Sequence, residues 1–178
     1  MTGRDADSTR SVRAEAASAG ADGGEGVAIR RASAGDLAAV VALLADDVRG
    51  ADRETPGDLA PYREAFARID ADPWTLVAVA VRGGAAVGTL QLTYLPGLSH
   101  RGATRAQIEA VRVAAGERGR GLGGRMVSWA VEQARTRGCR MVQLTSDAAR
   151  ADAHRFYTRL GFAASHVGFK LALEDPRA

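Results

Sequence analysis

The amino-acid sequence predicts a single α/β domain in which helices flank a central mixed sheet. A chain of 178 residues has the length of one domain, and 46% hydrophobic residues are enough for one core of ordinary size. Strand-like and helix-like segments follow one another in a mixed order, and no internal repeat is visible. In the middle of the chain, one strand pattern leads through a glycine-rich turn directly into a helix pattern. Together these observations predict a three-layer fold.

The first half of the domain is expected to contain two helices and a hairpin. Apolar periodicity places the elements, and Pro73 limits the second helix because proline cannot continue it. The expected elements are a strand at 27–32, a helix from Ser33 or Asp36 to Leu44 with Ser33 as its cap, a helix around 62–69, and paired strands at 74–81 and 86–95.

The second half is expected to alternate between strands and helices. Gly161 is predicted to end the last helix in the usual C-terminal role of glycine. The expected elements are a loop at 96–104, a strand at 105–114, a helix from Leu122 to Gly138, a strand at 140–145, a helix at 152–160, and two short strands at 162–165 and 169–173 that complete the sheet.

The first 26 residues differ from the rest of the chain. Residues 1–26 are rich in Ala, Gly, Ser and Asp and lack apolar periodicity, so we expect a disordered tail ahead of a domain at 27–174. The tail has no apolar stretch of signal-peptide length, and its acidic residues argue against a transit peptide. No later run approaches membrane-spanning length. The sequence therefore predicts a cytoplasmic protein with no membrane partner.

Charge and cysteine content exclude further classes of protein. The formal net charge is +3, and Lys170 is the only lysine among 24 basic residues. A modest positive field favours a polyanionic cofactor but is too weak, without a clustered face, to indicate nucleic acid. The single cysteine, Cys139, excludes an internal disulfide and a cysteine-cluster metal site, and we expect no metal.

The glycine-rich turn at Val111–Arg125 has the character of a phosphate site. Glycines at 119, 121 and 123 remove side chains that would keep a ligand from the backbone N–H groups. The unpaired amides of the first helical turn point outward with the positive end of the helix dipole. Such a turn suits a pyrophosphate.

Two other phosphate-binding motifs fit the turn less well. Gly119, Gly121 and Gly124 satisfy G-x-G-x-x-G, but a dinucleotide site expects an acidic residue about 20 positions on, at the end of the next strand. Here that distance falls near Cys139, at the start of a strand, and few elements remain after it. A Walker A loop fails because no Lys-Ser or Lys-Thr follows the glycines.

Two motifs, in order, resemble one known family. Arg118, Gly121 and Gly123 fit R/Q-x-x-G-x-G/A, which resembles the acetyl-CoA pyrophosphate loop of the GCN5-related N-acetyltransferases (GNAT family). Downstream, Ala153–Phe162 resembles that family's A-x-x-x-Y-x-x-x-G-F signature. A helix and a strand separate the two motifs, and the resemblance covers roughly Val27 to Leu173.

The resemblance implies acetyl-CoA as co-substrate and a GNAT acetyltransferase fold. Two parallel strands, here those ending at Ala114 and Thr145, are then expected to splay apart with the pantetheine arm in the gap. Unpaired backbone groups of a splayed strand need a partner, and the pantetheine amides can supply one. The residues implied in cofactor binding are Val111, Val113, Arg118, Gly119, Arg120, Gly121, Leu122, Gly123 and Gly124.

The chemistry of amine acetylation indicates two catalytic candidates. An attacking alkylamine has a pKa near about 10 and must lose a proton, so a base is needed directly or through water. Glu109, just before the splay, is the candidate base; the alternative is a strand-edge acid paired with Arg105 or Arg112. Tyr157 matches the family tyrosine that protonates the leaving thiolate, and the alternative is a core tyrosine. Arg150 stands where the family often has asparagine, which puts that residue's cofactor contact in question.

The acceptor is expected to be a small-molecule primary amine, and a homodimer is compatible with the sequence. The helical region and the loop at 96–104 are candidate acceptor contacts. The individual candidates are Asp46, Asp47, Arg49, Arg53, Gly97, Ser99, His100, Arg101, His154 and His166. Segments around Asp152–Tyr157 and Ser165-His166 resemble a bacterial subgroup that includes aminoalkylphosphonate acetyltransferases. The alternative function is a non-catalytic acyl-CoA-binding or regulatory protein on the same fold.

Overall fold

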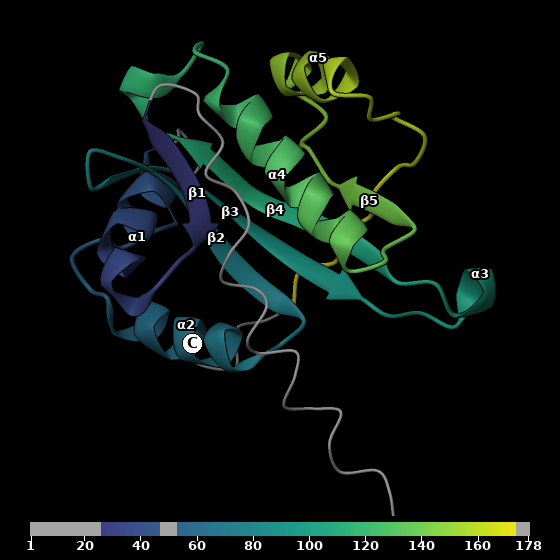
Figure 1. Cartoon of the computed structure of the whole chain (residues 1–178), viewed down its shortest axis with the longest axis horizontal. Coiled ribbons are helices and arrows are strands. Elements are labelled where there is room, and N and C mark those ends of the chain that lie inside the picture. Colours follow the sequence, from purple (N-terminus) through teal and green to yellow (C-terminus); the bar gives the residue numbers. More distant parts are fainter. Residues whose placement is uncertain (1–25, 47–52, 174–178) are drawn as a thin grey trace, which may run out of the picture.

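A computed structural model of the chain describes residues 26–46 and 53–173. Its centre is a five-stranded sheet in the order β1-β2-β3-β4-β5, antiparallel except for the parallel pair β4 and β5 (Figure 1). The strands are β1 (Val27–Arg31), β2 (Thr75–Arg82), β3 (Ala85–Leu95), β4 (Arg105–Val113) and β5 (Met141–Leu144). The helices are η2 (Ala34–Asp36), α1 (Leu37–Ala45), α2 (Ala60–Ala71), α3 (Ser99–Gly102), η3 (Ala115–Glu117), α4 (Leu122–Thr136) and α5 (Ala151–Arg159).

The sheet has a hydrophobic core on each face, which confirms the predicted three layers. Along β2, successive side chains point to opposite faces, so Ala78 and Ala80 pack under α4 while Val79 packs under α1. The α4 side holds the larger core, which includes the fully buried Leu90 and Met126. The mixed sheet flanked by helices is therefore the fold that the apolar periodicity predicted.

The predicted N-terminal elements are confirmed within one or two residues. Ser33 begins the helical segment, where its backbone N–H donates to Asp36 Oδ2 at 2.7 Å. Arg30 donates to both oxygens of the same carboxylate, at 2.8 and 2.9 Å, and this pairing holds the pKa of Asp36 well below its usual range. The β2–β3 hairpin turns at Gly83 and Gly84, which both have positive φ.

Two expectations for the second half were wrong. The segment at 96–104 is not wholly a loop, because it contains the short helix α3, in which His100 and Arg101 have φ of 52° and 63°. Residues 162–165 and 169–173 form no strand. Their period-2 pattern describes side chains that suit a pleated surface, but a strand also needs a hydrogen-bonded neighbour, which a pattern cannot supply. The sheet among the described residues therefore ends at β5.

Some predictions lie outside the described residues. These are the disordered tail, apart from Gly26, and the acceptor contacts proposed for Asp47 and Arg49. Within the described part of the chain, no helix combines the length and the apolar character needed to cross a bilayer.

Candidate active site

The parallel strands β4 and β5 separate partway along their length. Their pairing runs from Arg105 opposite Met141 to Ile108 opposite Leu144 and then stops, while β4 continues to Val113. The predicted splay is thus present. Along Glu109–Val113, the backbone groups on the β5 side have no strand to bond to, and such groups need another partner.

A β-bulge in β4 coincides with the start of this open edge. Thr89 pairs with Arg112 and Gln91 with Glu109, so Leu90 of β3 lies opposite two residues of β4, Ala110 and Val111. Ala110 has a φ of +52°, which is unusual and strained for a residue with a Cβ atom. Backbone strain of this kind is often found at functional sites. The sequence offered no signal for it, because alanine is not a residue typical of this conformation.

The glycine turn after β4 leads into the N-terminus of α4. Gly119 and Gly121 have φ of +78° and +79°, and Gly121 is the N-cap of α4, where no side chain caps the first amides. These amides and the helix dipole are available to an anion. Gly123 and Gly124 have a different structural use, since a Cβ atom there would lie 3.4 Å from Phe156 Cζ and 3.7 Å from Leu160 Cδ2. They allow α5 to pack closely on α4.

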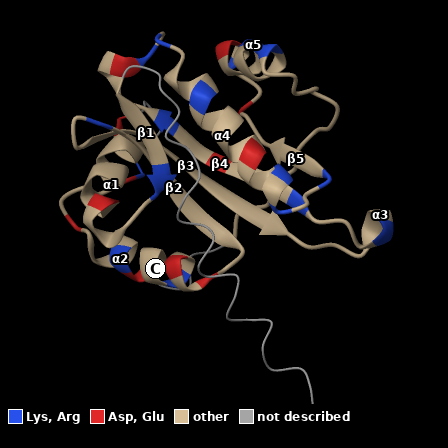
Figure 2. Cartoon of the chain, in the orientation of Figure 1, with Lys and Arg blue, Asp and Glu red and all other residues tan. Residues whose placement is uncertain are grey.

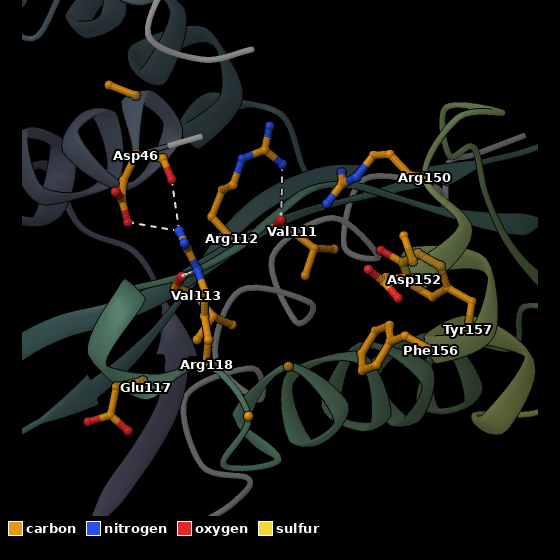
Figure 3. A pocket seen from close by; sticks show the side chains of 14 residues that line it. Asp46, Val111, Arg112, Val113, Glu117, Arg118, Arg150, Asp152, Phe156 and Tyr157 are labelled. Atoms are coloured by element: carbon orange, nitrogen blue, oxygen red, sulfur yellow. Dashed lines mark hydrogen bonds and ion pairs between the residues drawn. The ribbon is translucent and has the colours of Figure 1, made fainter. Parts of the chain in front are cut away.

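Two ion pairs fix the turn from either side. Glu117 of η3 accepts a hydrogen bond at Oε2 from Arg82 Nη2 at 3.3 Å, and the ion pair between the two side chains brings Arg82 Nε to 3.1 Å from Oε1. Arg118 donates from Nε to the Val113 carbonyl at 3.0 Å and from Nη2 to the backbone and carboxylate oxygens of Asp46, at 2.8 and 2.9 Å (Figure 3). The Arg118 side chain therefore joins the end of α1 to the end of β4. Its part in the turn is to hold the backbone in place.

A pocket of about 800 Å³ lies between this turn and α5. That volume is within the usual range for small-molecule and cofactor sites. In Figure 3, Arg118 and Val113 stand on one side of the pocket and Tyr157 and Arg150 on the other. Its lining residues are Ala45, Asp46, Val111, Arg112, Val113, Glu117, Arg118, Gly119, Gly123, Arg150, Asp152, Ala153, Phe156 and Tyr157.

Tyr157 enters the pocket from α5 and is held by other aromatic rings. Phe156 and Phe162 contact its ring edge-on, with centroid distances of 5.0 and 5.9 Å. Burial raises the pKa of the Tyr157 phenol above its usual value, and the positive charges of Arg150 and Arg112 oppose this with smaller effects. Its hydroxyl has no hydrogen-bond partner among the described residues. The phenol is therefore protonated at neutral pH and able to donate.

The structure brings six of the eleven predicted site residues to this pocket. Five others do not line it: Glu109, Arg120, Gly121, Leu122 and Gly124. The Leu122 side chain is buried in the core, so only its backbone can serve a ligand at the turn. Glu109 is exposed on β4, two residues before Val111, and its carboxylate takes part in no hydrogen bond or ion pair among the described residues. The predicted alternative, a carboxylate paired with Arg105 or Arg112, is thus not what the structure shows.

Several pocket residues were missed or left open by sequence reasoning. Four residues that were not proposed as site residues line the pocket: Arg112, Glu117, Asp152 and Phe156. Arg150, which stands where the family often has asparagine, lines the pocket too. Arg112 and Glu117 lie close to the first motif, but a motif of residue types does not show which side chains face the pocket. Asp46, a predicted acceptor candidate, lines the pocket as well.

The three histidines lie outside the pocket lining. His154 Nε2 is 2.9 Å from the Asp147 carbonyl, and His166 Nδ1 is 2.8 Å from Ser165 Oγ. His100 is in α3, and none of Gly97, Ser99, His100 and Arg101 lines the pocket. In Figure 1, α3 lies at the end of β4 remote from the glycine turn. Across the described ranges, no group of three His, Cys, Asp or Glu side chains is placed to hold a metal ion.

Comparison with known proteins agrees with this geometry. The model of the acetyltransferase (GNAT) family matches residues 37–162. An aminoalkylphosphonate N-acetyltransferase from Salmonella typhimurium is 31% identical over 145 residues, which are 82% of this chain and 90% of that protein.

Two solved structures share the fold over most of the chain. A protein described as a transcriptional regulator from Bacillus halodurans C-125 superposes with a TM-score of 0.80 at 46% identity, covering 83% of this chain and 99% of its own. For a putative acetyltransferase from Agrobacterium tumefaciens, the TM-score is 0.75 and the identity 29%, with 82% of this chain and 99% of that chain covered.

Strain at the bulge predicts the effect of substitutions at Ala110. Ala110→Val should lower the free energy of unfolding by about 1–3 kcal/mol, because a β-branched residue tolerates positive φ poorly, whereas Ala110→Gly should not lower it. Urea denaturation measures both. Ala85→Val, at an exposed strand position with ordinary backbone angles, is the control and should change stability by less than about 0.5 kcal/mol. Equal losses at the two positions would contradict strain at Ala110.

Proposed function

The chain belongs to the acetyltransferase (GNAT) family, and we propose that it transfers the acetyl group of acetyl-CoA to a primary amine of a small molecule. GNAT acetyltransferases use acetyl-CoA as co-substrate. The observation that carries the proposal is the convergence, around one pocket, of the open edge of β4, the glycine turn and the Tyr157 hydroxyl. This convergence supports the proposal because it would give the thioester arm and the phosphates a place each and would bring a proton donor to them.

Backbone groups are proposed to bind most of the co-substrate. The open edge at Val111 and Val113 would accept and donate hydrogen bonds to the pantetheine amides. The amides at the N-terminus of α4 would hold the pyrophosphate, with Gly119 and Gly121 leaving them accessible. Arg120, an exposed residue of the turn, is proposed to add a positive charge beside the phosphates.

The proposed reaction is direct attack of the amine on the thioester. The amine nitrogen loses its extra proton to Glu109, directly or through water, and then bonds to the acetyl carbon. The carbon–sulfur bond of the resulting tetrahedral intermediate breaks, and Tyr157 donates its proton to the departing thiolate. The second proton, which the nitrogen loses as it becomes an amide, returns through water to the Tyr157 phenolate. The amide product and the free thiol leave. The accessible, unpaired carboxylate of Glu109 supports its role, since a base engaged in an ion pair would be weaker.

We infer that the acceptor carries an anionic group beside its amine. The relative from Salmonella is named for aminoalkylphosphonates. In this chain, Arg112 and Arg150 both line the pocket near Tyr157, and their positive charges act on its phenol. The Arg150 side chain has no partner among the described residues. We therefore extend the proposal to an aminoalkylphosphonate or a similar amine with an anionic group.

Thiol release with a panel of amines tests the proposed activity. The panel pairs each aminoalkylphosphonate with an alkylamine of the same length that lacks the phosphonate, and we expect faster release with the anionic member of each pair. Equal rates within the pairs would contradict the acceptor class alone. Acetyl-CoA binding by calorimetry without turnover of any amine would contradict the enzyme and support the non-catalytic alternative.

The glycine turn is tested by Gly121→Asp. This change places a negative side chain where the phosphates are proposed to lie, so acetyl-CoA affinity should fall tenfold or more, which is about 1.4 kcal/mol. Calorimetric titration measures the affinity. Gly138→Asp is the matched control, because Gly138 follows the other end of α4 with a φ of +75° and also has open space around a Cβ atom. If both variants bind like the wild type, the turn is not the phosphate site.

Removing the Tyr157 hydroxyl tests the proton donor. Tyr157→Phe keeps the ring and its aromatic contacts, so acetyl-CoA affinity should stay close to wild type while turnover falls about 100-fold, the low end of a general acid's contribution. Steady-state kinetics at saturating substrates measure this. Tyr94→Phe removes a hydroxyl from the buried core and should leave turnover unchanged. A Tyr157→Phe enzyme within a few-fold of wild type, with chemistry rate-limiting, would make Tyr157 a packing residue.

The proposed base predicts a change in pH dependence. A carboxylate that accepts a proton from an ammonium group must be ionised, so wild-type turnover should decline toward acidic pH. Glu109→Gln should reduce turnover and remove or displace that acidic limb, with little effect on acetyl-CoA binding. Glu132→Gln, on the exposed surface of α4, is the control. An unchanged pH profile in Glu109→Gln would assign the proton transfer to water or another residue.

A further inference from the structure

Arg105, the first residue of β4, carries a charge that no partner neutralises within the described chain. Its Nε atom is buried, and its guanidinium forms no hydrogen bond or ion pair with any described residue. Buried charged donors are normally paired, because leaving one unpaired costs free energy. Arg105 does not line the pocket and belongs to neither motif. Its charge therefore has no role in the acetyl transfer proposed for that pocket.

Arg105 begins a row of polar side chains on one face of β4. Side chains alternate along a strand, and Ala106 and Ile108 are buried in the core under α4. Arg105, Gln107 and Glu109 therefore lie on the opposite face of the sheet, and these three residues are here called the polar row. Glu109, the proposed base, is at one end of the row, and the cationic Arg105 is at the other.

The middle of the polar row offers groups that can bond to a ligand. Gln143 of β5 lies opposite Gln107 in the parallel ladder and donates from Nε2 to Gln107 Oε1 at 2.7 Å. Neither side chain forms another hydrogen bond among the described residues, and both are partly exposed. One amide nitrogen and one amide oxygen of the pair thus stay available, as a donor and an acceptor.

The segment at 96–104 lies beside the positive end of the row. A Cβ atom on Gly97 would be 3.9 Å from both Arg105 Nη1 and Ser99 Oγ, so the guanidinium and the hydroxyl flank the same point of the chain. A hydroxyl is a further donor for an anion. Residues 96–108 contain no acidic residue, and in Figure 2 α3 carries a basic segment and no acidic one. An anion at Arg105 would therefore meet no like charge from this part of the chain.

We propose that the acceptor lies along the polar row, with its amine at Glu109 and a second anionic group at Arg105. This inference rests on the proposed function, in which Glu109 is the base. Arg112 and Arg150 would bind the anionic group beside the amine, and Arg105 would bind the one at the remote end. The acceptor class is thus an elongated amine with two negative groups, such as a 2-amino dicarboxylate.

The charges at the two ends of the row set the orientation and the length of this acceptor. An ammonium group is attracted to Glu109, and a carboxylate or phosphonate to Arg105. Four residues at about 3.3 Å each separate the two Cα atoms by about 13 Å. An acceptor long enough to pair with both ends can also bond to the glutamines between them, whereas a shorter one leaves Arg105 unpaired. Preference for a remote negative group should therefore grow with acceptor length.

Matched pairs of amines test the inference. Each 2-amino dicarboxylate is paired with its ω-amide, which has the same length but no remote charge, and the series covers increasing chain lengths. Calorimetric titration of the full chain with CoA bound measures affinity without turnover. The dicarboxylate should bind about tenfold more tightly, or better, once it is long enough to reach Arg105, because the amide forfeits a charge-assisted hydrogen bond. Equal affinities at every length would overturn the inference.

Variants assign the preference to Arg105. Arg105→Gln should remove it and Arg105→Lys should retain part of it, with circular dichroism as the check on folding. Arg140→Gln is the matched control, since Arg140 is an exposed arginine whose backbone N–H donates to the Thr104 carbonyl, next to Arg105. A preference that survives Arg105→Gln, or that Arg140→Gln removes equally, would overturn the inference. If Arg105→Gln does not fold, the wild-type series alone decides.

Thiol release from acetyl-CoA, followed with the same amines, separates this inference from the proposed function. Binding with the expected preference but no release with any amine would support the subsite and contradict the enzyme. Release that is indifferent to the remote charge, with equal affinities, would support the enzyme and overturn the subsite.

Discussion

The separation of β4 from β5 after Ile108 and Leu144 is the constraint on which the candidate site depends. Backbone amides and carbonyls that lose their ladder must bond to something else, because leaving them buried and unpaired costs about 1–3 kcal/mol each. The bulge at Ala110 adds strain at the same place and exposes two consecutive side chains, Glu109 and Ala110. A ligand with amide groups relieves this deficit without any dedicated side chain. The open edge would thereby let the backbone of β4 bind the proposed pantetheine arm.

The rigidity of the glycine turn comes from its neighbours more than from its own sequence. Glycines permit the positive φ of the turn, but their conformational freedom would let it fluctuate. Arg82 and Arg118 limit this freedom by binding Glu117 and Asp46. The pair of Arg118 with Asp46 is half-exposed on both sides and contributes about 0.2–1 kcal/mol at most, so its effect on overall stability is small. Its two bonds to main-chain carbonyls make it a geometric link between α1 and the turn.

The sequence predicted those features that depend on local pattern or on a motif. Apolar periodicity located α1, α2, α4 and α5 and the five strands of the sheet, and the two motifs led to Val111, Val113 and Tyr157. Features that depend on partners distant in the chain were not predictable. The bulge at Ala110 is a shift in the register between β3 and β4, and the orientation of Arg112 toward the pocket follows from this shift. The strand expected at 169–173 failed for the same reason, since alternation describes a strand but does not provide its neighbour.

Tyr157 is subject to two opposing electrostatic effects, and their balance determines what it can do. Burial disfavours the phenolate and raises its pKa, while Arg150 and Arg112 favour the phenolate and lower it. Burial is the larger effect, so the net shift is upward and the proton stays on the phenol at neutral pH. The same two arginines stabilise any other negative charge that develops nearby, including a thiolate. The pocket thus combines a protonated phenol with a positive field, and the proposed donation of a proton to a thiolate would use both.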